Sequence, residues 1–227
     1  MMIAAFAQRN RSFIRMTASI SGLVASAGDF IVTTILGLLY PGYSFIHHTE
    51  SFLGTSDSPV AIYMNSWGII FSLLLIVFAL GLRVTVFRHG NWQKLFVILV
   101  ILYGFGEGVG SGLFPHDHVE GVLTLSGKIH NVFGAIGGVA LAFIPYGGMN
   151  IFAKDTRRYA HQYSLFTFVT GIVLIGMFLL SKQNIIDYPG WWQRLFLFDY
   201  HCYLFFIAVV AMRYPSDRFQ GEGWDLF

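Results

Sequence analysis

Four side chains of this sequence could together carry the chemistry of a hydrolase. They are Ser51, Glu107, Asp117 and His130. A histidine titrates near neutrality and can act as a general base, a carboxylate can orient its ring, and a serine can be the nucleophile. Ser51 lies in a polar segment and Asp117 follows a proline, so both also fit ordinary turn residues. The sequence therefore predicts a catalytic group built around His130.

Three further polar residues are candidates for substrate binding. Gln193 and Arg194 lie together near the start of the last apolar stretch, and Glu50 lies in the first polar segment. A guanidinium anchors a phosphate or carboxylate through paired hydrogen bonds. Arg194 could instead be the structural partner of Glu107, because an unpaired charge inside an apolar stretch costs several kcal/mol. We expect Glu107 to face the protein interior within hydrogen-bond reach, directly or through one water, of Arg194 or His130, as an ion pair or as a proton donor or acceptor.

Histidines are the other candidates for chemistry. A catalytic zinc ion takes three protein ligands and keeps a fourth position open. The candidate ligands are His47, His48, His130 and His201, with His116 and His118 near enough to join them. No spacing among these residues requires a metal, and histidines in polar loops are commonly only hydrated. The zinc hypothesis predicts that His130 and at least two other histidines converge.

The elements that must hold these residues in place are apolar helices. Of the 227 residues, 55% are hydrophobic and only 11% are charged, against about 25% charged residues in a soluble domain. A bilayer is crossed by a helix of about 20 mainly apolar residues. Stretches of this kind are 18–40, 60–82, 95–114, 129–153, 160–181 and 192–212. We expect an all-α polytopic membrane protein, a single domain of six transmembrane helices over residues 1–227, with the lipid bilayer as a partner.

Lysine and arginine are divided unequally between the ends of these stretches. Most of the 14 basic residues precede the first stretch or follow the second, fourth and sixth. Only Lys128, Lys182 and Arg194 fall at the opposite ends. Because basic residues resist translocation, this bias predicts cytoplasmic N- and C-termini in a plasma or inner membrane. The candidate site would then open on the non-cytoplasmic face, and we expect residues 47–58 to fold back over it as a lid.

A run of glycines surrounds Glu107 in the third stretch. Gly104, Gly108 and Gly112 recur every four residues, a spacing that lets a neighbouring helix approach closely. A backbone in lipid must satisfy its own hydrogen bonds, so we expect a helix here and not an isolated strand. The glycines therefore predict close helix packing around an intramembrane carboxyl.

Motifs in a fixed order are found in three segments, "YPGYSFIHHTESFLGTSDSPVAIYMNSWG", "GSGLFPHDHVEGVLTLSGKIHNVFGAIG" and "GWWQRLF". A Pro-Gly-Tyr-Ser turn and a Ser-x-Leu-Gly segment follow the first span, and Phe-Pro-x-Asp ends the third. His130 opens the fourth span and Gln193-Arg194 opens the sixth. In order and topology they resemble the membrane family known as domain of unknown function 998 (DUF998). The resemblance covers nearly the whole chain and implies a fold and a site region, but no reaction.

A weaker likeness is to the membrane hydrolases that include alkaline ceramidases and adiponectin receptors. Those proteins hold zinc with three histidines beside a serine and an aspartate, and the resemblance gives such parts to Ser51, Asp117 and His130. The sequence departs from them in the last span. There it has only His201, where those proteins have a His-x-x-x-His pair.

The leading functional prediction is an enzyme, hydrolase-like in one version, for a lipid or other apolar small molecule at the outer leaflet. The alternative is a proton-coupled transporter that works through the intramembrane carboxyls Asp29, Glu107 and Asp199. A third interpretation is a membrane partner subunit without chemistry. The net charge of +2 is too small to favour a nucleic-acid partner. A cavity closed at mid-membrane would favour the enzyme, and a polar path continuing past Asp29 would favour the transporter.

Overall fold

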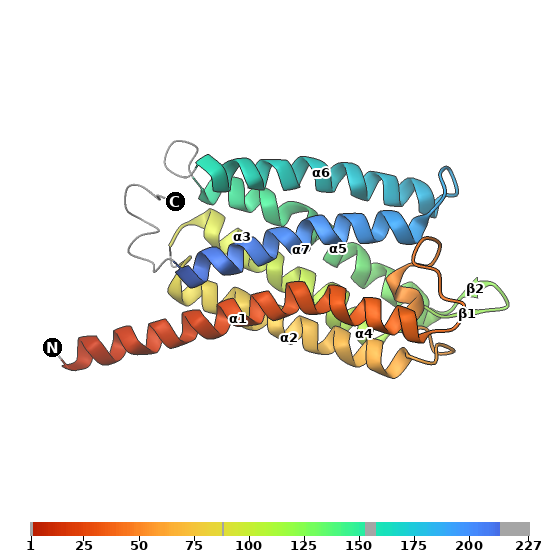
Figure 1. The fold of residues 1–227 in the computed structure, drawn as a ribbon, viewed down its shortest axis with the longest axis horizontal. Coiled ribbons are helices and arrows are strands. Elements are labelled where there is room, and N and C mark those ends of the chain that lie inside the picture. The colour runs from red at the N-terminus through yellow and green to blue at the C-terminus, as the bar shows by residue number, and fades with distance from the viewer. Residues whose placement is uncertain (1, 88, 153–157, 214–227) are drawn as a thin grey trace.

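Long apolar helices run along the longest axis of the molecule (Figure 1). The computed structural model describes residues 2–87, 89–152 and 158–213, with side chains from residue 10 onward. The elements are α1 (Met2–Leu39), η1 (Glu50–Gly54), α2 (Ala61–Thr85), α3 (Asn91–Tyr103), η2 (Gly104–Gly110), α4 (Ser111–Leu113), β1 (His118–Val119), β2 (Val122–Leu123), α5 (Leu125–Ile151), α6 (Arg158–Lys182) and α7 (Pro189–Arg213).

Within the described residues, 6 helices are long and apolar enough to cross a membrane, with α3, η2 and α4 forming one continuous span. The predicted all-α bundle of six spans is therefore confirmed. The spans after α1 begin and end within a few residues of the predicted positions. Helix α1 begins at Met2, well before the expected residue 18.

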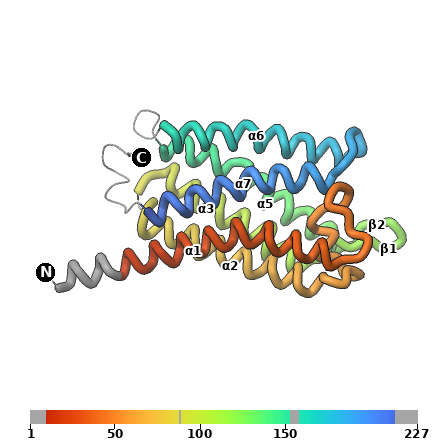
Figure 2. Tube along the Cα trace, in the orientation of Figure 1, coloured from red at the N-terminus to blue at the C-terminus, as the bar shows by residue number. Residues whose placement is uncertain are grey.

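The spans form a closed ring. Helix α1 contacts α2 and α7, α7 contacts α6, α6 contacts α5, α5 contacts α3, and α3 contacts α2. Figure 2 shows that α1 begins and α7 ends at one end of the ring. The connections 40–60, 114–124 and 183–188 gather at the other end, which we call the loop end. The candidate site residues of the sequence come mainly from these connections and from the helix turns beside them.

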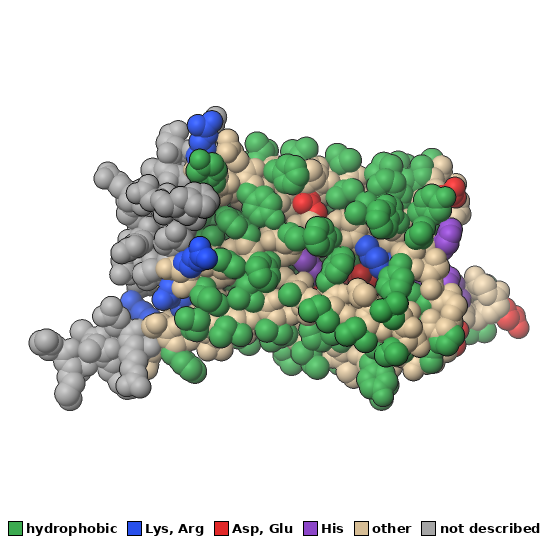
Figure 3. All heavy atoms as spheres, in the orientation of Figure 1, with side chains coloured by type: hydrophobic (Ala, Val, Ile, Leu, Met, Phe, Trp, Pro, Cys, Tyr) green, Lys and Arg blue, Asp and Glu red, His purple; other side chains and the backbone are tan. Residues whose placement is uncertain are grey.

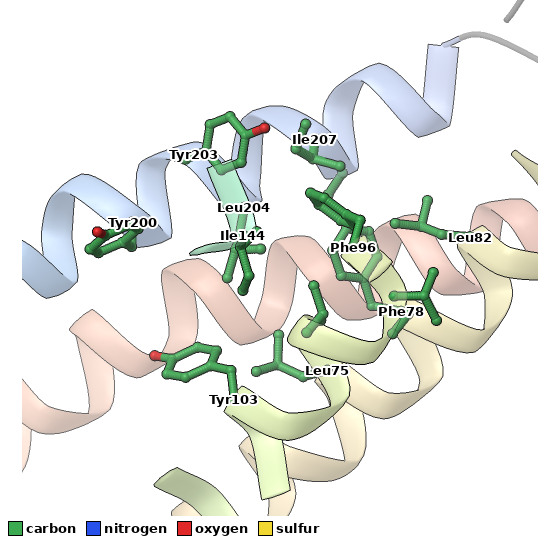
Figure 4. Packing of buried hydrophobic residues seen from close by; sticks show 14 of the residues in the cluster. Leu75, Phe78, Leu82, Phe96, Tyr103, Ile144, Tyr200, Tyr203, Leu204 and Ile207 are labelled. Carbon is green, nitrogen blue, oxygen red and sulfur yellow. The ribbon is translucent and has the colours of Figure 1, made fainter. Parts of the chain in front are cut away.

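The half of the ring away from the loop end is filled with large apolar side chains (Figure 4). The labelled residues that are at most 1% exposed and come from this half are Leu75, Phe78, Leu82, Phe96, Ile144, Tyr203, Leu204 and Ile207. This half of the bundle is packed mainly with apolar side chains.

Apolar side chains also cover the outside of the helices. Figure 3 shows them along the length of the visible face, while most of the lysine and arginine side chains in this view lie at the end where α1 begins. Leu73, Val139 and Val173 are each more than half exposed. A soluble protein rarely leaves so continuous an apolar surface uncovered, so lipid is the environment that suits it.

A short hairpin projects from the loop end. Strand β1 pairs antiparallel with β2, with His118 opposite Leu123 and Val119 opposite Val122. Glu120 and Gly121 connect the strands with φ values of 51° and 78°, and two positive φ angles in a two-residue turn match the twist of a hairpin. The sequence analysis did not predict this hairpin, which lies outside the membrane spans.

Candidate functional site

Glu107 lies at the centre of a π-helical segment. This segment, η2, packs between α2 and α5. A Cβ atom at Gly108 or Gly112 would collide with backbone oxygens of α2, and one at Gly106 would collide with the backbone of α5. The predicted close packing along Gly104, Gly108 and Gly112 is therefore confirmed. Gly106, on another face of the segment, allows α5 to pack closely as well. Short π-helical segments inside α-helices frequently occur at functional sites.

The Glu107 side chain lies on the glycine face of α5. A Cβ atom at Gly137 would be 2.8 Å from Glu107 Cγ, and one at Gly134 would be 3.8 Å from its Oε1. The carboxyl forms no hydrogen bond or ion pair with any residue in the described part of the chain. The prediction that Glu107 faces into the bundle is confirmed, and its carboxyl is left available to another molecule.

A small pocket opens beside Glu107. Its polar lining consists of Ser51, Asn65, Glu107, Ser111, His116 and His130. The remaining lining comes from Met64 and from glycines of η1, α2 and α4. The structure therefore brings Ser51, Glu107 and His130, which the sequence analysis named as catalytic, to one cavity near the loop end.

The His130 ring is oriented by a backbone carbonyl. Its Nδ1 lies 2.9 Å from the oxygen of Phe114. Because a carbonyl only accepts hydrogen bonds, Nδ1 carries the proton, and Nε2 is the basic nitrogen of the neutral ring. This arrangement prepares His130 to accept a proton at Nε2.

A second histidine, His116, packs against His130 and lines the same pocket. The ring centroids of His116 and His130 are 5.1 Å apart, and those of His116 and His118 are 5.0 Å apart. Burial lowers the pKa of His116 to about 4, and the charges of His130, Lys182 and His118 lower it further against a hydrogen bond with Asn131. His116 is therefore neutral at physiological pH.

The Asp117 carboxylate binds a serine of the lid and does not orient His130. Its Oδ1 accepts a 2.8 Å hydrogen bond from Ser56 N, and its Oδ2 accepts one of 2.5 Å from Ser56 Oγ. The Asp117 carbonyl accepts from Thr124 N at 3.0 Å and from Thr124 Oγ1 at 3.1 Å. The predicted pairing of Asp117 with His130 is therefore wrong, because the turn after Phe114 directs the carboxylate toward the lid.

Ser51 lies in η1 and lines the pocket without contacting a base. Its Oγ lies 3.0 Å from Thr49 Oγ1. Among the described residues, no hydrogen bond joins Ser51 to His130 or His130 to Asp117. A serine–histidine–aspartate triad is not assembled in this structure.

The connection between α1 and α2 folds over the loop end as a lid, as predicted from residues 47–58. Glu50, Leu53 and Gly54 of this lid are buried. Asn65 Nδ2 in α2 donates a 3.1 Å hydrogen bond to Gly54 O, and Leu53 packs in an apolar cluster with Leu36 of α1. The lid forms one wall of the pocket.

Arg194 fastens the lid to α7. Its Nη1 donates to the carbonyls of Phe45, His48 and Gly190, each at 3.0 Å. Its Nη2 donates to the hydroxyl of Tyr43. The guanidinium therefore donates its hydrogen bonds to the lid and to the start of α7, and not to a ligand.

Glu50 is the carboxylate that accompanies Arg194. Its Oε1 lies 3.9 Å from Arg194 Nε, and its backbone N donates a 2.7 Å hydrogen bond to Gln193 Oε1. The predicted pair of Arg194 with Glu107 is wrong, because the lid inserts Glu50 next to the guanidinium. The three predicted substrate-binding residues Glu50, Gln193 and Arg194 do lie together, but they bind one another.

Other carboxyls lie near Glu50 inside the bundle. Burial raises the pKa of Glu50, and so do the charges of Asp29 and Glu107, against the lowering influence of Arg194 and of a hydrogen bond from Thr33. Acidic groups from α1, η1 and η2 therefore share one electrostatic environment at the inner side of the lid.

Asp29 has partners that the sequence analysis did not identify. Its Oδ1 accepts a 2.9 Å hydrogen bond from Trp67 Nε1, and its Oδ2 lies 3.6 Å from His201 Nδ1. His201 Nε2 lies 2.7 Å from the hydroxyl of Tyr103. The sequence does contain Trp67, Tyr103 and His201 inside apolar spans. It does not show which helices are the neighbours of α1 in the ring, so these contacts could not be predicted.

The buried acids and histidines end at the middle of the bundle. Asp199, the remaining intramembrane acid, accepts a 2.7 Å hydrogen bond from Thr170 Oγ1 between α6 and α7. Beyond Tyr103 and His201 the interior is mainly apolar, with hydroxyl groups such as those of Ser164 and Tyr203, which lie 2.9 Å apart. Among the described buried residues, no acid or histidine continues from the pocket to the opposite end.

The histidines named as zinc ligands lie in different surroundings. His48 Nδ1 accepts a 3.1 Å hydrogen bond from Ser44 N, the His47 ring packs on Tyr188, and His201 is deep in the bundle. Within residues 2–87, 89–152 and 158–213, no group of three or more His, Cys, Asp or Glu side chains is placed to hold a metal ion. The predicted ligand set around His130 is therefore wrong, although the rings of His116 and His118 do approach it.

The comparison with protein families gives one match. The family described as "Protein of unknown function (DUF998)" matches residues 23–213, from within α1 to the end of α7. The search of curated proteins and the search of solved structures each gave no match, so neither supports the weaker likeness to the ceramidase type. The matched range includes the lid, η2, His130 and Arg194, and it spans well over half of the 227 residues. The chain therefore belongs to the DUF998 family of membrane proteins.

Proposed function

We propose that this protein is a membrane enzyme that takes a lipid-like or other apolar small molecule into the pocket and transfers protons with Glu107 and His130. One observation carries the proposal. A carboxyl without a partner among the described residues and an oriented imidazole line the same cavity. Two protonatable groups in one cavity can serve as general acid and general base.

The mainly apolar core supports chemistry at the pocket over passage through the bundle. The buried residues Leu75, Phe78 and Leu204 belong to the apolar packing away from the loop end (Figure 4). A molecule that enters at the loop end would reach this apolar layer and would leave again at the loop end. The pocket thus has the geometry expected of an enzyme site open on one side.

The loop end is proposed to be the non-cytoplasmic end. Basic residues favour the cytoplasmic side, and most of those visible in Figure 3 lie at the end where α1 begins. With this orientation the pocket opens toward the outer leaflet of the membrane. The exposed apolar surface of the neighbouring helices would then deliver lipid-like molecules to it.

The reaction that the geometry favours is proton transfer and not serine-dependent hydrolysis. Ser51 lines the pocket without a base, Asp117 is bound to Ser56, and Arg194 is bound to the lid. The Glu107 carboxyl and His130 Nε2 are available to donate or accept a proton. Hydrolysis by this pair would use water as the nucleophile.

A second candidate is a proton-coupled carrier, which the Asp29, His201 and Tyr103 contacts favour. These groups continue from the lid to the middle of the bundle and could relay a proton. Proton flux into vesicles that contain the purified protein, abolished by Asp29→Asn, would be the mark of a carrier. An enzyme is expected to show no such flux.

The enzyme proposal is tested by filling the pocket. Ser111→Leu adds a bulky apolar side chain to the lining, whereas Ser66→Leu makes the same change at an exposed position of α2 outside it. Small molecules extracted from the purified variants are compared by mass spectrometry. A molecule that copurifies with the wild type and Ser66→Leu but not with Ser111→Leu supports the proposal, and identical extracts from all three contradict it.

Proton-transfer chemistry is tested on the same molecule. Membranes that contain the wild type are expected to convert it, while Glu107→Gln and His130→Gln are expected not to convert it even at saturating concentration. Conversion at the wild-type rate by both variants would contradict the acid–base roles.

A further inference from the structure

We propose that the molecule which enters the pocket carries a protonated amine and that Glu107 binds this ammonium group. This inference rests on the pocket being the working site, as proposed above, and names the class of molecule that the site takes. The charges and the hydrogen-bonding groups of the lining both lead to it.

The charge of the lining is the first argument. Glu107 is the one acidic side chain among the residues that line the pocket, and no lysine or arginine lines it. His116 adds no positive charge at physiological pH, because burial lowers its pKa to about 4. A ligand cation can therefore neutralise Glu107, which no described residue does.

Arg194, the arginine that binds the lid, is already engaged. Arg194 Nη1 donates to three backbone carbonyls, its Nη2 donates to Tyr43, and its Nε faces Glu50. A carboxylate or phosphate head group in the pocket would place a second negative charge near Glu107, and no lysine or arginine lines the pocket to balance it. An anionic ligand is therefore disfavoured by the same contacts that close the lid.

Hydrogen-bond acceptors are the second argument. Asn65 uses its Nδ2 to donate to Gly54 O, which leaves its amide oxygen as an acceptor. Ser51 and Ser111 contribute hydroxyl oxygens to the lining. An ammonium group has three donors and no acceptor, so it matches a carboxylate surrounded by oxygen acceptors.

The remaining lining suits an apolar chain. Met64 contributes a flexible apolar side chain, and Gly54, Gly68 and Gly112 contribute no side chain at all. The pocket is small and partly open, so it suits a compact head group such as an ammonium, with the attached chain leaving through the opening. An amine joined to an alkyl chain therefore fits the lining better than a large polar molecule.

The test compares three amphiphiles of equal chain length. Dodecylamine, dodecanol and dodecanoate are each added to the protein in nanodiscs of a zwitterionic lipid, and the thermal midpoint of unfolding is followed with concentration. A ligand that binds the folded state raises this midpoint. We expect dodecylamine to raise the midpoint of the wild type at concentrations where the alcohol and the carboxylate do not.

Two carboxyl-to-amide variants locate the effect. Glu107→Gln is expected to weaken the dodecylamine response about tenfold or more in concentration, as loss of a desolvated charge partner does. Asp199→Asn removes another intramembrane carboxyl, which binds Thr170 away from the pocket, and is expected to keep the response. If Glu107→Gln does not fold, Ser111→Leu replaces it, because that variant blocks the pocket and leaves the carboxyl in place.

The possible outcomes distinguish failure of the amine inference from failure of the proposed function of the pocket. An equal response to dodecanol or dodecanoate, lost in Ser111→Leu, would overturn the amine preference and keep the pocket as a binding site. Responses to all three amphiphiles that are unchanged in Ser111→Leu would show binding elsewhere and overturn both. Loss of the dodecylamine response in Glu107→Gln but not in Asp199→Asn supports the inference.

Discussion

The guanidinium of Arg194 lies 3.9 Å from the Glu50 carboxylate and joins the lid to α7 across the loop end. The same guanidinium satisfies carbonyls in the first half of the connection between α1 and α2 and at the start of α7. The pocket wall that contains Ser51 and Gly54 is therefore held in place by a residue that does not line the pocket.

Replacement of Arg194 by methionine is expected to destabilise the protein strongly, whereas Glu107→Gln is not. The first change leaves carbonyls and a buried carboxylate unpaired and should lower the free energy of unfolding by ~3–5 kcal/mol. The second removes no hydrogen bond and should cost less than ~1 kcal/mol. Chemical unfolding in detergent micelles checks the order of the two, and a larger loss in Glu107→Gln would contradict the lid assignment.

Stability between pH 6.5 and 4 is expected to depend on His116. Its folded pKa is lowered from 6.5 to about 4, so the unfolded chain binds the proton more readily in this interval. The contribution is complete above pH 6.5 and is lost as the pH falls toward 4. Thermal midpoints of the wild type and His116→Gln should converge as the pH falls through this range, and parallel curves would show that the histidine is not buried as described.

The hydroxyl groups of two buried tyrosines are expected to contribute differently to the free energy of unfolding. Tyr103→Phe removes the group that lies 2.7 Å from His201 Nε2 and leaves this buried nitrogen without a hydrogen-bond partner, which should cost ~1–3 kcal/mol. The Tyr200 hydroxyl is buried without a hydrogen-bond partner among the described residues, so Tyr200→Phe should be neutral or stabilising. Equal losses in the two variants would contradict the Asp29–His201–Tyr103 arrangement.

Adjacent glycines of α5 are expected to respond oppositely to alanine. At Gly137 a Cβ would lie 2.8 Å from Glu107 Cγ and 3.0 Å from Glu107 N, so Gly137→Ala must displace η2. At Gly138 a Cβ meets no atom within 4 Å, and alanine should stabilise the helix by up to ~1 kcal/mol. Thermal unfolding of both variants checks the π-helical placement of Glu107, which a stable Gly137→Ala protein would contradict.

The sequence was informative about the spans and about the neighbourhood of the pocket. Apolar stretches of bilayer length predict the helices, and the glycine spacing predicts close packing around Glu107. His130 and Ser51 were placed correctly at one cavity because both follow or open a span at the same end of the bundle.

Side-chain partners were harder to predict, because several acids lie near the same end. Glu50 and Glu107 were both available to Arg194, and only the path of the lid decides between them. Asp29 meets Trp67 and His201 because α1 packs on both α2 and α7, an order of helices that hydropathy does not encode. The π-helical form of η2 likewise depends on contacts with two neighbouring helices and has no separate sequence signal.

The most direct test of the central claim is chemical access to the pocket. In a Cys202→Ala background, single cysteines replace Ser111 in the pocket, Val122 at the hairpin and Asn91 at the other end, and intact cells are treated with a small impermeant thiol reagent. Asn91 and Val122 are exposed, so either reacts when its side of the membrane is reached. We expect Ser111→Cys and Val122→Cys to react from outside and Asn91→Cys not to react, with dodecylamine slowing only the Ser111→Cys reaction. Labelling of Asn91→Cys alone, or a Ser111→Cys rate that no amphiphile changes, would contradict a ligand pocket open to the outer face.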